Sequence, residues 1–224
     1  EIVRMRRRTL VVVIGIIAVI GFALAALFYP GQPASDYLPA EAAQPAEAPT
    51  AQNLVRFHSP SFGPADARVT VVEFFDPSCE ACRAFYPIVK QMMDKHPQDI
   101  RVVVRYVLNH EGSEEAARII EAARKQNLFV PVLEALLDSQ PAWHDDAQVM
   151  AGWEAAERAG LDVQKARGQM HSADINAALS KDAADAQRLG IRGTPTFFVN
   201  GRVLTQFGAQ PLYDLIRSEI DKPR

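Results

Sequence analysis

Two cysteines, the only ones in the chain, stand three residues apart directly after an apolar run, and this placement constrains the fold more than any other feature. The run, residues 69–75 (Val-Thr-Val-Val-Glu-Phe-Phe), is rich in β-branched and aromatic residues and predicts a buried strand. Pro77 and Ser78 end the strand, and a helix is expected to begin at Cys79. Free N–H groups and the helix dipole stabilise a thiolate at such a position. Cys79 is therefore predicted to be a nucleophile and Cys82, one turn later, its disulfide partner.

Other uses of two cysteines make different demands on the sequence. A tetrahedral zinc site needs two further Cys or His ligands at a suitable spacing, and no second pair is present. A purely structural disulfide across so short a loop would remove little chain entropy. A copper site that combines both thiolates with His58 or His110 stays open. The order of strand, Cys-x-x-Cys and helix favours redox chemistry without a metal.

The N-terminal residues predict a membrane anchor. Residues 1–9 carry four arginines, and the nineteen residues 10–28 contain no charge, which is close to the ~20 that a membrane-crossing helix needs. The basic side of such a segment stays in the cytoplasm, so the remainder would be exported. A signal peptide cleaved at the small-residue motif 23–25 is the alternative. We expect a retained signal-anchor over residues 10–29, because the apolar run exceeds the usual core of about 7–15 residues in a signal peptide.

The next segment, residues 30–53, is rich in Pro, Ala, Glu and Gln and has few large apolar residues. It cannot bury enough surface to offset its chain entropy, so it is expected to form a flexible linker. The first 29 residues have a net charge of +3, which leaves −6 for the rest of a chain whose total is −3. An acidic exported part without a basic patch gives no support to nucleic-acid binding.

Residues 54–224 show the pattern of one α/β domain. A second β-branched run at 100–108 predicts another buried strand. Residues 113–189 change to helical periodicity and are expected to form a helical insertion. A further strand, the hairpin dipeptide Asn200-Gly201 and a final amphipathic helix complete the order.

In this order the chain resembles the DsbA-like branch of the thioredoxin superfamily, whose members are exported thiol–disulfide oxidoreductases. The resemblance covers roughly residues 54–222 and rests on two motifs, Glu-Phe-Phe-Asp-Pro-Ser-Cys-Glu-Ala-Cys at 73–82 and Gly-Thr-Pro-Thr at 193–196. The motifs stand in the expected order with a helical block between them. The implied fold class is α/β, a thioredoxin fold with a helical insertion.

The resemblance implies a role for each matching position. Cys79 corresponds to the exposed, attacking cysteine and Cys82 to the more buried, resolving cysteine. Pro195 corresponds to the family's cis-proline, beside which substrate backbone binds, the alternative being a trans proline of an edge strand. Thr194 would approach the thiol pair and tune substrate choice and redox poise. Glu73 stands where the family has a buried acid that relays the proton of Cys82, the alternative being an outward-facing strand position.

The dipeptide between the cysteines departs from the family pattern. Strong oxidants of this branch usually carry Pro-His there, whereas this chain has Glu80-Ala81. A carboxylate beside Cys79 is expected to raise the pKa of its thiol relative to those members, and Asp76 would act in the same direction. Since a higher thiolate pKa means a less stabilised reduced form, a weaker oxidant is expected.

The sequence therefore predicts a membrane-anchored, extracytoplasmic thiol–disulfide oxidoreductase that acts on cysteines of exported proteins. The alternatives are a disulfide reductase or isomerase of the same fold and a copper-binding chaperone. No cofactor is required, because the cysteine pair itself cycles. Expected partners are protein substrates with cysteines or disulfides and a redox partner protein in the membrane. The expected location is the inner (cytoplasmic) membrane, crossed once, with the C-terminal domain in the periplasm or extracytoplasmic space.

Overall fold

The computed structural model describes residues 49–223, whose secondary structure follows the order expected from the sequence. The first half contains α2 (Ala51–Leu54), β1 (Ser61–Phe62), β2 (Val69–Phe75), α3 (Glu80–Lys95) and β3 (Ile100–Tyr106). The helical insertion comprises α4 (Ser113–Arg124), α5 (Phe129–Ser139), the 3-10 helix η1 (Gln140–Ala142), α6 (Met150–Arg158), α7 (Val163–Gln169) and α8 (Ala173–Arg188). The chain ends with β4 (Thr196–Val199), β5 (Arg202–Val203) and α9 (Ala209–Ile220).

Strand β2 lies at the centre of a five-stranded sheet with the order β1-β3-β2-β4-β5. It pairs in parallel with β3 and antiparallel with β4, while β1 is antiparallel to β3. The predicted hairpin is confirmed, because Asn200 and Gly201 join β4 to β5 with φ angles of 47° and 84°. Two consecutive positive φ angles are what a two-residue type I′ turn requires.

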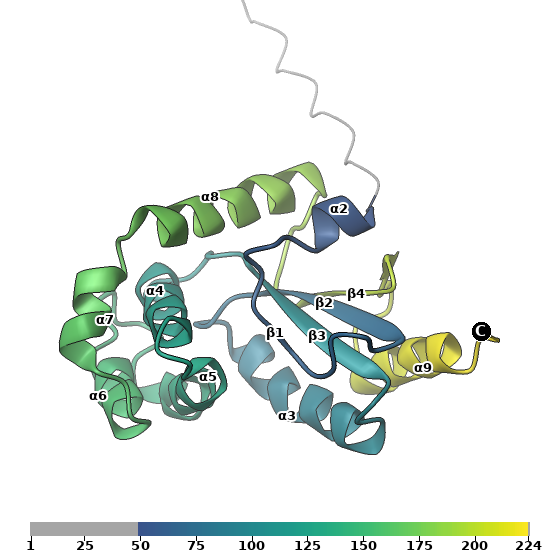
Figure 1. Cartoon of the computed structure of the whole chain (residues 1–224), viewed down its shortest axis with the longest axis horizontal. Coiled ribbons are helices and arrows are strands. Elements are labelled where there is room, and N and C mark those ends of the chain that lie inside the picture. The colour runs from purple at the N-terminus through teal and green to yellow at the C-terminus, as the bar shows by residue number, and fades with distance from the viewer. Residues whose placement is uncertain (1–48, 224) are drawn as a thin grey trace, which may run out of the picture. The chain divides into compact units, whose positions relative to one another are not determined.

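Helices cover both faces of the sheet: α3 and α9 lie on one side, and α2 and α8 on the other (Figure 1). Successive strand side chains point to opposite faces. Val71 therefore packs in the cluster with α3 and α9, whereas Val72 and Phe74 pack with Leu54 and Leu189. This two-sided burial explains why β2 is almost continuously apolar.

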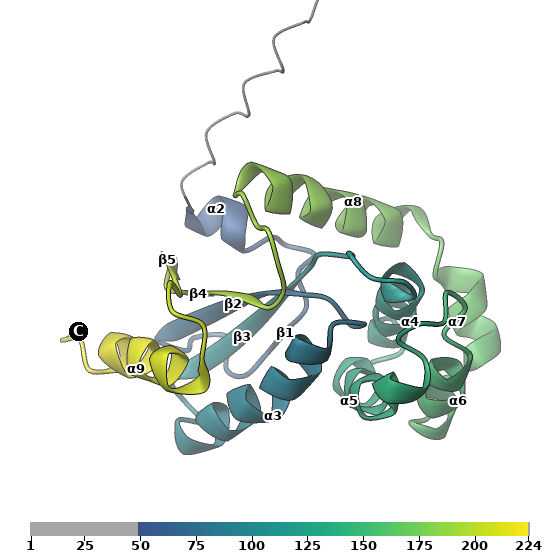
Figure 2. The ribbon, with the colours of Figure 1, turned by 180° about the vertical axis from the view of Figure 1, so that it is seen from behind.

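Helices α4 to α7 gather beside one end of the sheet (Figure 2). They form a third apolar cluster around Trp143 and Trp153, whose side chains are both buried. The same cluster includes Phe75 at the end of β2 and both Cys79 and Cys82. The cysteine pair thus lies at the contact between the insertion and the sheet.

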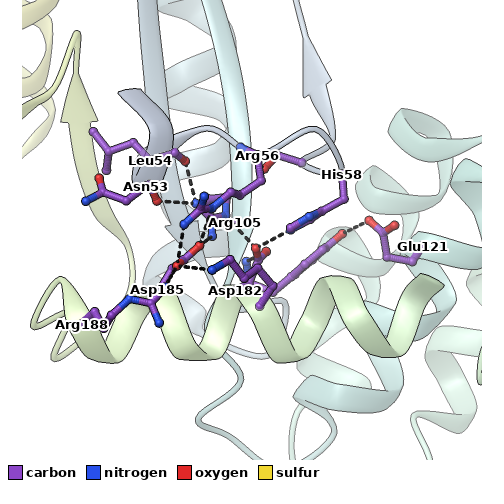
Figure 3. A network of polar contacts seen from close by, with 12 residues as sticks. Asn53, Leu54, Arg56, His58, Arg105, Glu121, Asp182, Asp185 and Arg188 are labelled. Atoms are coloured by element: carbon purple, nitrogen blue, oxygen red, sulfur yellow. Dashed lines mark hydrogen bonds and ion pairs between the residues drawn. The ribbon is translucent and has the colours of Figure 1, made fainter. Parts of the chain in front are cut away.

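A buried ion network joins β3 to α8 and α2 (Figure 3). The fully buried Arg105 guanidinium donates to Asp182 Oδ1 at 2.7 Å and to Asp185 Oδ2 at 2.6 Å. It also donates to the carbonyl oxygens of Asn53 and Leu54. Paired charges of this kind tolerate burial, which explains an arginine in the fully buried part of β3.

Several sequence expectations concern the N-terminal part. The predicted transmembrane segment, residues 10–29, and the linker up to residue 48 lie outside the described residues. The composition places residues 51–53 in the linker, but they begin α2, and Asn53 is buried where its carbonyl meets Arg105. From residue 49 to residue 223, no helix combines the length and the apolar character that crossing a membrane requires.

Candidate active site

Cys79 is the N-cap residue of α3, so the helix begins one residue later than the sequence predicts. Its extended backbone, with φ −74° and ψ 121°, places the residue at the free N-terminus of the helix. Both cysteines are free thiols in this structure. The Cys79 residue is 7% exposed and Cys82 is 0% exposed, which is the order expected for an attacking and a resolving cysteine.

The surroundings lower the pKa of Cys79 from 9.0 to about 5. The largest cause is a hydrogen bond with the Cys82 thiol, and burial acts against it. The Thr194 side chain and the backbone N–H groups of Ala81 and Cys82 lower the pKa further. Glu80, expected to raise the pKa, is exposed to solvent, where salt and water screen its charge. Cys79 is therefore a thiolate at neutral pH.

Cys82 has the opposite character. Burial raises the pKa of its thiol, and the hydrogen bond with Cys79 and the charge of Glu73 act in the same direction. The backbone N–H of Asp76, 3.5 Å from Cys82 Sγ, lowers the pKa without reversing the shift. The pair thus combines a thiolate and a thiol that keeps its proton. Resolving a mixed disulfide through Cys82 requires that this proton be removed.

Glu73 lies in the middle of β2 and is 4% exposed, so the outward-facing alternative is wrong. Burial, with a smaller effect from the negative charge of Cys79, raises the pKa of its carboxyl to about 8. Its Oε1 atom has no hydrogen-bond partner within residues 49–223. A carboxyl group with this pKa can both accept and release a proton near neutral pH.

The Thr194-Pro195 loop lies beside the cysteine pair, and the peptide bond between the two residues is cis, as the resemblance implies. The Cys79 Sγ atom lies 3.3 Å from the Thr194 carbonyl oxygen, to which the thiol donates when it carries its proton. The pairing of β4 with β2, which sets Thr196 opposite Phe74, brings the loop to this position. The sequence-predicted residues Cys79, Cys82 and Thr194 are therefore in contact.

Asp76 has a role that the sequence does not predict. Its fully buried carboxylate is surrounded by donors, so it anchors the loop before Cys79 instead of acting as a free negative charge. The hydrogen bonds come from Ser78 N at 2.9 Å, Ser113 Oγ at 2.5 Å, Asn109 N at 2.8 Å and His110 Nδ1 at 2.7 Å. The spacing of these donors along the chain gives no signal that would reveal the cluster.

The two histidines considered for a copper site bond to different carboxylates. His58 Nε2 lies 2.8 Å from Asp182 in the network of Figure 3, and His110 Nδ1 lies 2.7 Å from Asp76. Across the part of the chain that the structure describes, no three His, Cys, Asp or Glu side chains are grouped to hold a metal ion.

The fold and the site together define a thioredoxin-fold protein with a reduced Cys-x-x-Cys pair beside a cis-proline. The thioredoxin family's sequence model matches residues 57–218. A thioredoxin-like oxidoreductase from Silicibacter pomeroyi has a similar structure, with 30% identity and a TM-score of 0.68 over 78% of this chain and 99% of that one. The chain belongs to the thioredoxin family, in its DsbA-like branch.

Curated relatives are of two kinds. The probable disulfide bond formation protein D of Bacillus cereus is 28% identical over 172 residues, which are 72% of this chain and 77% of that protein. The Na(+)/H(+) antiporter NhaA of Herminiimonas arsenicoxydans is 34% identical over 142 residues, which are 63% of this chain but 22% of the antiporter. The chain thus spans about a fifth of the length of the antiporter relatives.

Proposed function

We propose that the chain is a thiol–disulfide oxidoreductase in which Cys79 forms and breaks mixed disulfides with cysteines of exported proteins. The observation that carries this proposal is the asymmetry of the pair, in which the pKa of Cys79 is about 5 while that of Cys82 is raised. A thiolate is the attacking and the leaving species of disulfide exchange. The names of two relatives, a disulfide bond formation protein and a thioredoxin-like oxidoreductase, support the same chemistry.

The proposed oxidising cycle starts from a Cys79–Cys82 disulfide. A substrate thiolate attacks Cys79 Sγ, the bond between the two cysteines breaks, and Cys82 leaves and takes up a proton. A second substrate thiolate then attacks the substrate sulfur of the mixed disulfide, and Cys79 leaves as a thiolate. Two electrons pass from the substrate to the pair. The low pKa of Cys79 favours the second step, because a thiol with a low pKa leaves faster.

Two neighbouring elements are proposed to assist. Glu73, buried and with a pKa of about 8, exchanges a proton with Cys82 as that residue leaves or attacks. The loop at Thr194 and Pro195 holds the substrate chain, since its carbonyl oxygen already lies next to Cys79 Sγ. Glu80 and Ala81, between the cysteines, are proposed to tune the redox poise, Ala81 through its backbone N–H.

The pKa of Cys79 supports the oxidising direction over the reducing one. A value of about 5 lies between the roughly 7 of thioredoxin and the roughly 3.5 of DsbA. A stabilised thiolate stabilises the reduced pair, and a stable reduced form makes the disulfide a stronger oxidant. The sequence expectation of an oxidant weaker than the Pro-His members agrees with this intermediate value.

We further propose that the domain is tethered to the inner membrane and faces the extracytoplasmic space. The uncharged residues 10–28 and the arginines before them support a single crossing with the N-terminus in the cytoplasm. Disulfide chemistry on exported proteins takes place in that compartment. Continued turnover would require a membrane partner that reoxidises the pair.

The decisive experiment is to measure the reduction potential of the cysteine pair in the full chain, in detergent, against glutathione buffers. A value between about −120 and −200 mV is expected for a disulfide donor, whereas a value near −270 mV would assign a reductase. In parallel, a Cys82→Ala variant should accumulate mixed disulfides on non-reducing gels. The matched Cys79→Ala variant, which keeps only Cys82, should show none, and equal adducts in the two variants would contradict the assigned nucleophile.

A further inference from the structure

The side chain of Gln140 connects the helical insertion to the backbone that carries the cysteine pair. Gln140 is the first residue of η1 and is fully buried. Its Nε2 atom donates to the carbonyl oxygens of Pro77, at 2.6 Å, and of Cys79, at 3.1 Å. Its Oε1 atom accepts a hydrogen bond from Arg83 Nε at 2.9 Å. One amide from the insertion thus bonds to the chain before, at and after the Cys-x-x-Cys segment.

The turn that carries Gln140 is itself held firmly. The Gln140 carbonyl oxygen accepts from the backbone N–H groups of Trp143, at 3.0 Å, and of His144, at 2.9 Å. The buried Trp143 indole donates to Leu136 O at 3.0 Å and to Ser139 Oγ at 3.1 Å. The Gln140 side chain therefore extends from a fixed point of the insertion.

Cys79 needs such support because its own side chain does not cap the helix. N-cap residues are usually Ser, Thr, Asp or Asn, whose side-chain oxygen accepts from the first turn and fixes the extended conformation. The Cys79 sulfur makes no side-chain capping hydrogen bond of full strength, although the backbone N–H groups of Ala81 and Cys82 lie near enough to lower the pKa of its thiol. Its carbonyl oxygen instead accepts from the Gln140 amide and from the backbone N–H of Arg83.

We infer that Gln140 is a positioning residue through which the helical insertion holds the Cys79 backbone in the extended conformation that keeps its sulfur at the N-terminus of α3. In that conformation the backbone N–H groups of Ala81 and Cys82 lie near the sulfur, and both lower the pKa of Cys79. Without the Gln140 amide, the Pro77 carbonyl oxygen would have to turn toward another donor, and the Cys79 carbonyl oxygen would keep only the backbone N–H of Arg83. The sulfur would then move away from the helix N-terminus.

The test is the thiolate titration of Cys79 in the full chain, followed by the rate of alkylation with iodoacetamide against pH. Gln140→Met keeps the length of the side chain and removes its polar atoms, whereas Gln140→Glu keeps only the acceptor for Arg83. Both variants are expected to raise the pKa of Cys79 by about one unit. Below pH 5 the alkylation rate should then be about tenfold lower, because it is proportional to the fraction of thiolate. Trp153→Phe is the matched control, because it removes a buried indole of the insertion, bonded to Glu115 Oε1 at 2.9 Å, and leaves the bonds of the η1 turn and of the Cys79 backbone in place. It should lower the melting temperature and leave the titration unchanged.

An unchanged pKa in either folded Gln140 variant would overturn the inference. An equal shift in Trp153→Phe would also overturn it, since the effect would then follow from general loosening of the insertion. If Gln140→Met fails to fold, Gln140→Leu decides, because it also removes both amide donors and adds no charge near Cys79. The inference deepens the proposed function, but its readout does not depend on turnover. Absence of disulfide exchange in the unmodified chain would remove the proposed function, while the shift in the variants would still support the role of Gln140.

Discussion

The sulfur of Cys79 lies 3.3 Å from the carbonyl oxygen of Thr194, although the two residues are 115 positions apart in the chain. The antiparallel pairing of β2 and β4 produces this contact, because the loop that follows β2 and the loop that precedes β4 meet at one edge of the pairing. A peptide that binds along the Thr194 backbone would therefore pass directly beside the reacting sulfur. The sheet therefore places the proposed nucleophile beside the loop proposed to bind substrate.

The first prediction concerns the ionisation of the pair. Alkylation of the reduced chain by iodoacetamide should follow a single titration near pH 5, from Cys79, because the pKa of this thiol is lowered to about 5. Cys82 should stay unmodified up to pH 9, since burial raises the pKa of its thiol. Mass spectrometry of the alkylated peptides assigns each site. A midpoint near 9.0, the ordinary pKa of the cysteine thiol, would contradict the thiolate.

The same shift predicts how the stability of the reduced chain depends on pH. The pKa of Cys79 is lower in the folded state than its ordinary 9.0, so the ionised sulfur stabilises the fold most above pH 9. That contribution should be lost as the pH falls toward 5. Urea unfolding of the reduced chain and of Cys79→Ser should therefore give curves that converge in acid and separate at higher pH. Parallel curves at all pH values would contradict the linkage.

Glu73→Gln should make the folded state more stable and slow the resolution of mixed disulfides. The pKa of the Glu73 carboxyl is raised from 4.5 to about 8, so the folded state binds more protons than the unfolded state in that window. Stability is then lost as the pH rises from 4.5 to 8, and the neutral glutamine avoids this loss. We expect Glu73→Gln to be more stable at pH 7 by on the order of 3 kcal/mol in urea unfolding. It should also resolve mixed disulfides at least tenfold more slowly in stopped-flow measurements, because the proton relay is gone.

Glu121 offers a matched control for Glu73. It is also buried, but its carboxylate accepts from Tyr106 Oη at 3.0 Å and from Arg124 at 2.6 Å. Glu121→Gln should reduce stability, since it breaks a paired charge, and should leave the rate of resolution unchanged. A faster rate in Glu73→Gln, or equal rates in all three proteins, would remove Glu73 from the mechanism.

The sequence predicts the parts of this protein that local pattern determines. The strand that ends at Phe75, the helix after Cys79 and the hairpin at Asn200 each follow from neighbouring residues, because strand propensity, helix termination and turn chemistry act over a few positions. The position of Thr194 beside Cys79 follows only from the resemblance of two distant motifs to one family. Periodicity alone contains no information on which strand pairs with β2.

The polar contacts that fix the site are not predictable from the sequence. Gln140 bonds to backbone oxygens 61 and 63 positions away, and Arg105 bonds to carboxylates 77 and 80 positions away. A glutamine at the end of a helix or an arginine in a strand has many possible partners, and only the packed structure selects one. The effect of Asp76 on Cys79 differs from expectation for the same reason, since four donors surround a carboxylate that sequence proximity alone presents as a free charge.

His110 should make the stability of the domain depend on pH. Its Nδ1 atom lies 2.7 Å from Asp76 Oδ2, and this hydrogen bond, with the charges of Asp76 and Cys79, raises the pKa of the imidazole above 6.5. Because the pKa of His110 is raised in the folded state, its pair with Asp76 contributes fully to stability below pH 6.5. That contribution is lost as the pH rises through the pKa that His110 has in the folded state. His110→Gln should therefore lower the melting temperature at pH 5.5 and have a smaller effect at pH 9.

The control for His110 is His144, which pairs at 3.0 Å with the exposed Asp145 at the surface. An exposed pair of this kind contributes little, so His144→Gln should change the melting temperature by less than about 2 °C at both pH values. A loss in His110→Gln that is equal at pH 5.5 and pH 9 would show that the imidazole acts by packing and not by charge.

Arg105→Met should be the most destabilising of these substitutions. It leaves Asp182 and Asp185 in the interior without the guanidinium that pairs with both, and removing one partner of a buried ion pair typically costs about 3–5 kcal/mol. Adding Asp182→Asn should recover part of the loss, since Asp185 still pairs with Arg56 at 2.7 Å. The neighbouring Arg101→Met, at the edge of the same strand, should cost less than about 1 kcal/mol. Urea unfolding measures all three, and a double variant no more stable than Arg105→Met would show that packing of the arginine stem, not its charge, holds β3 to α8.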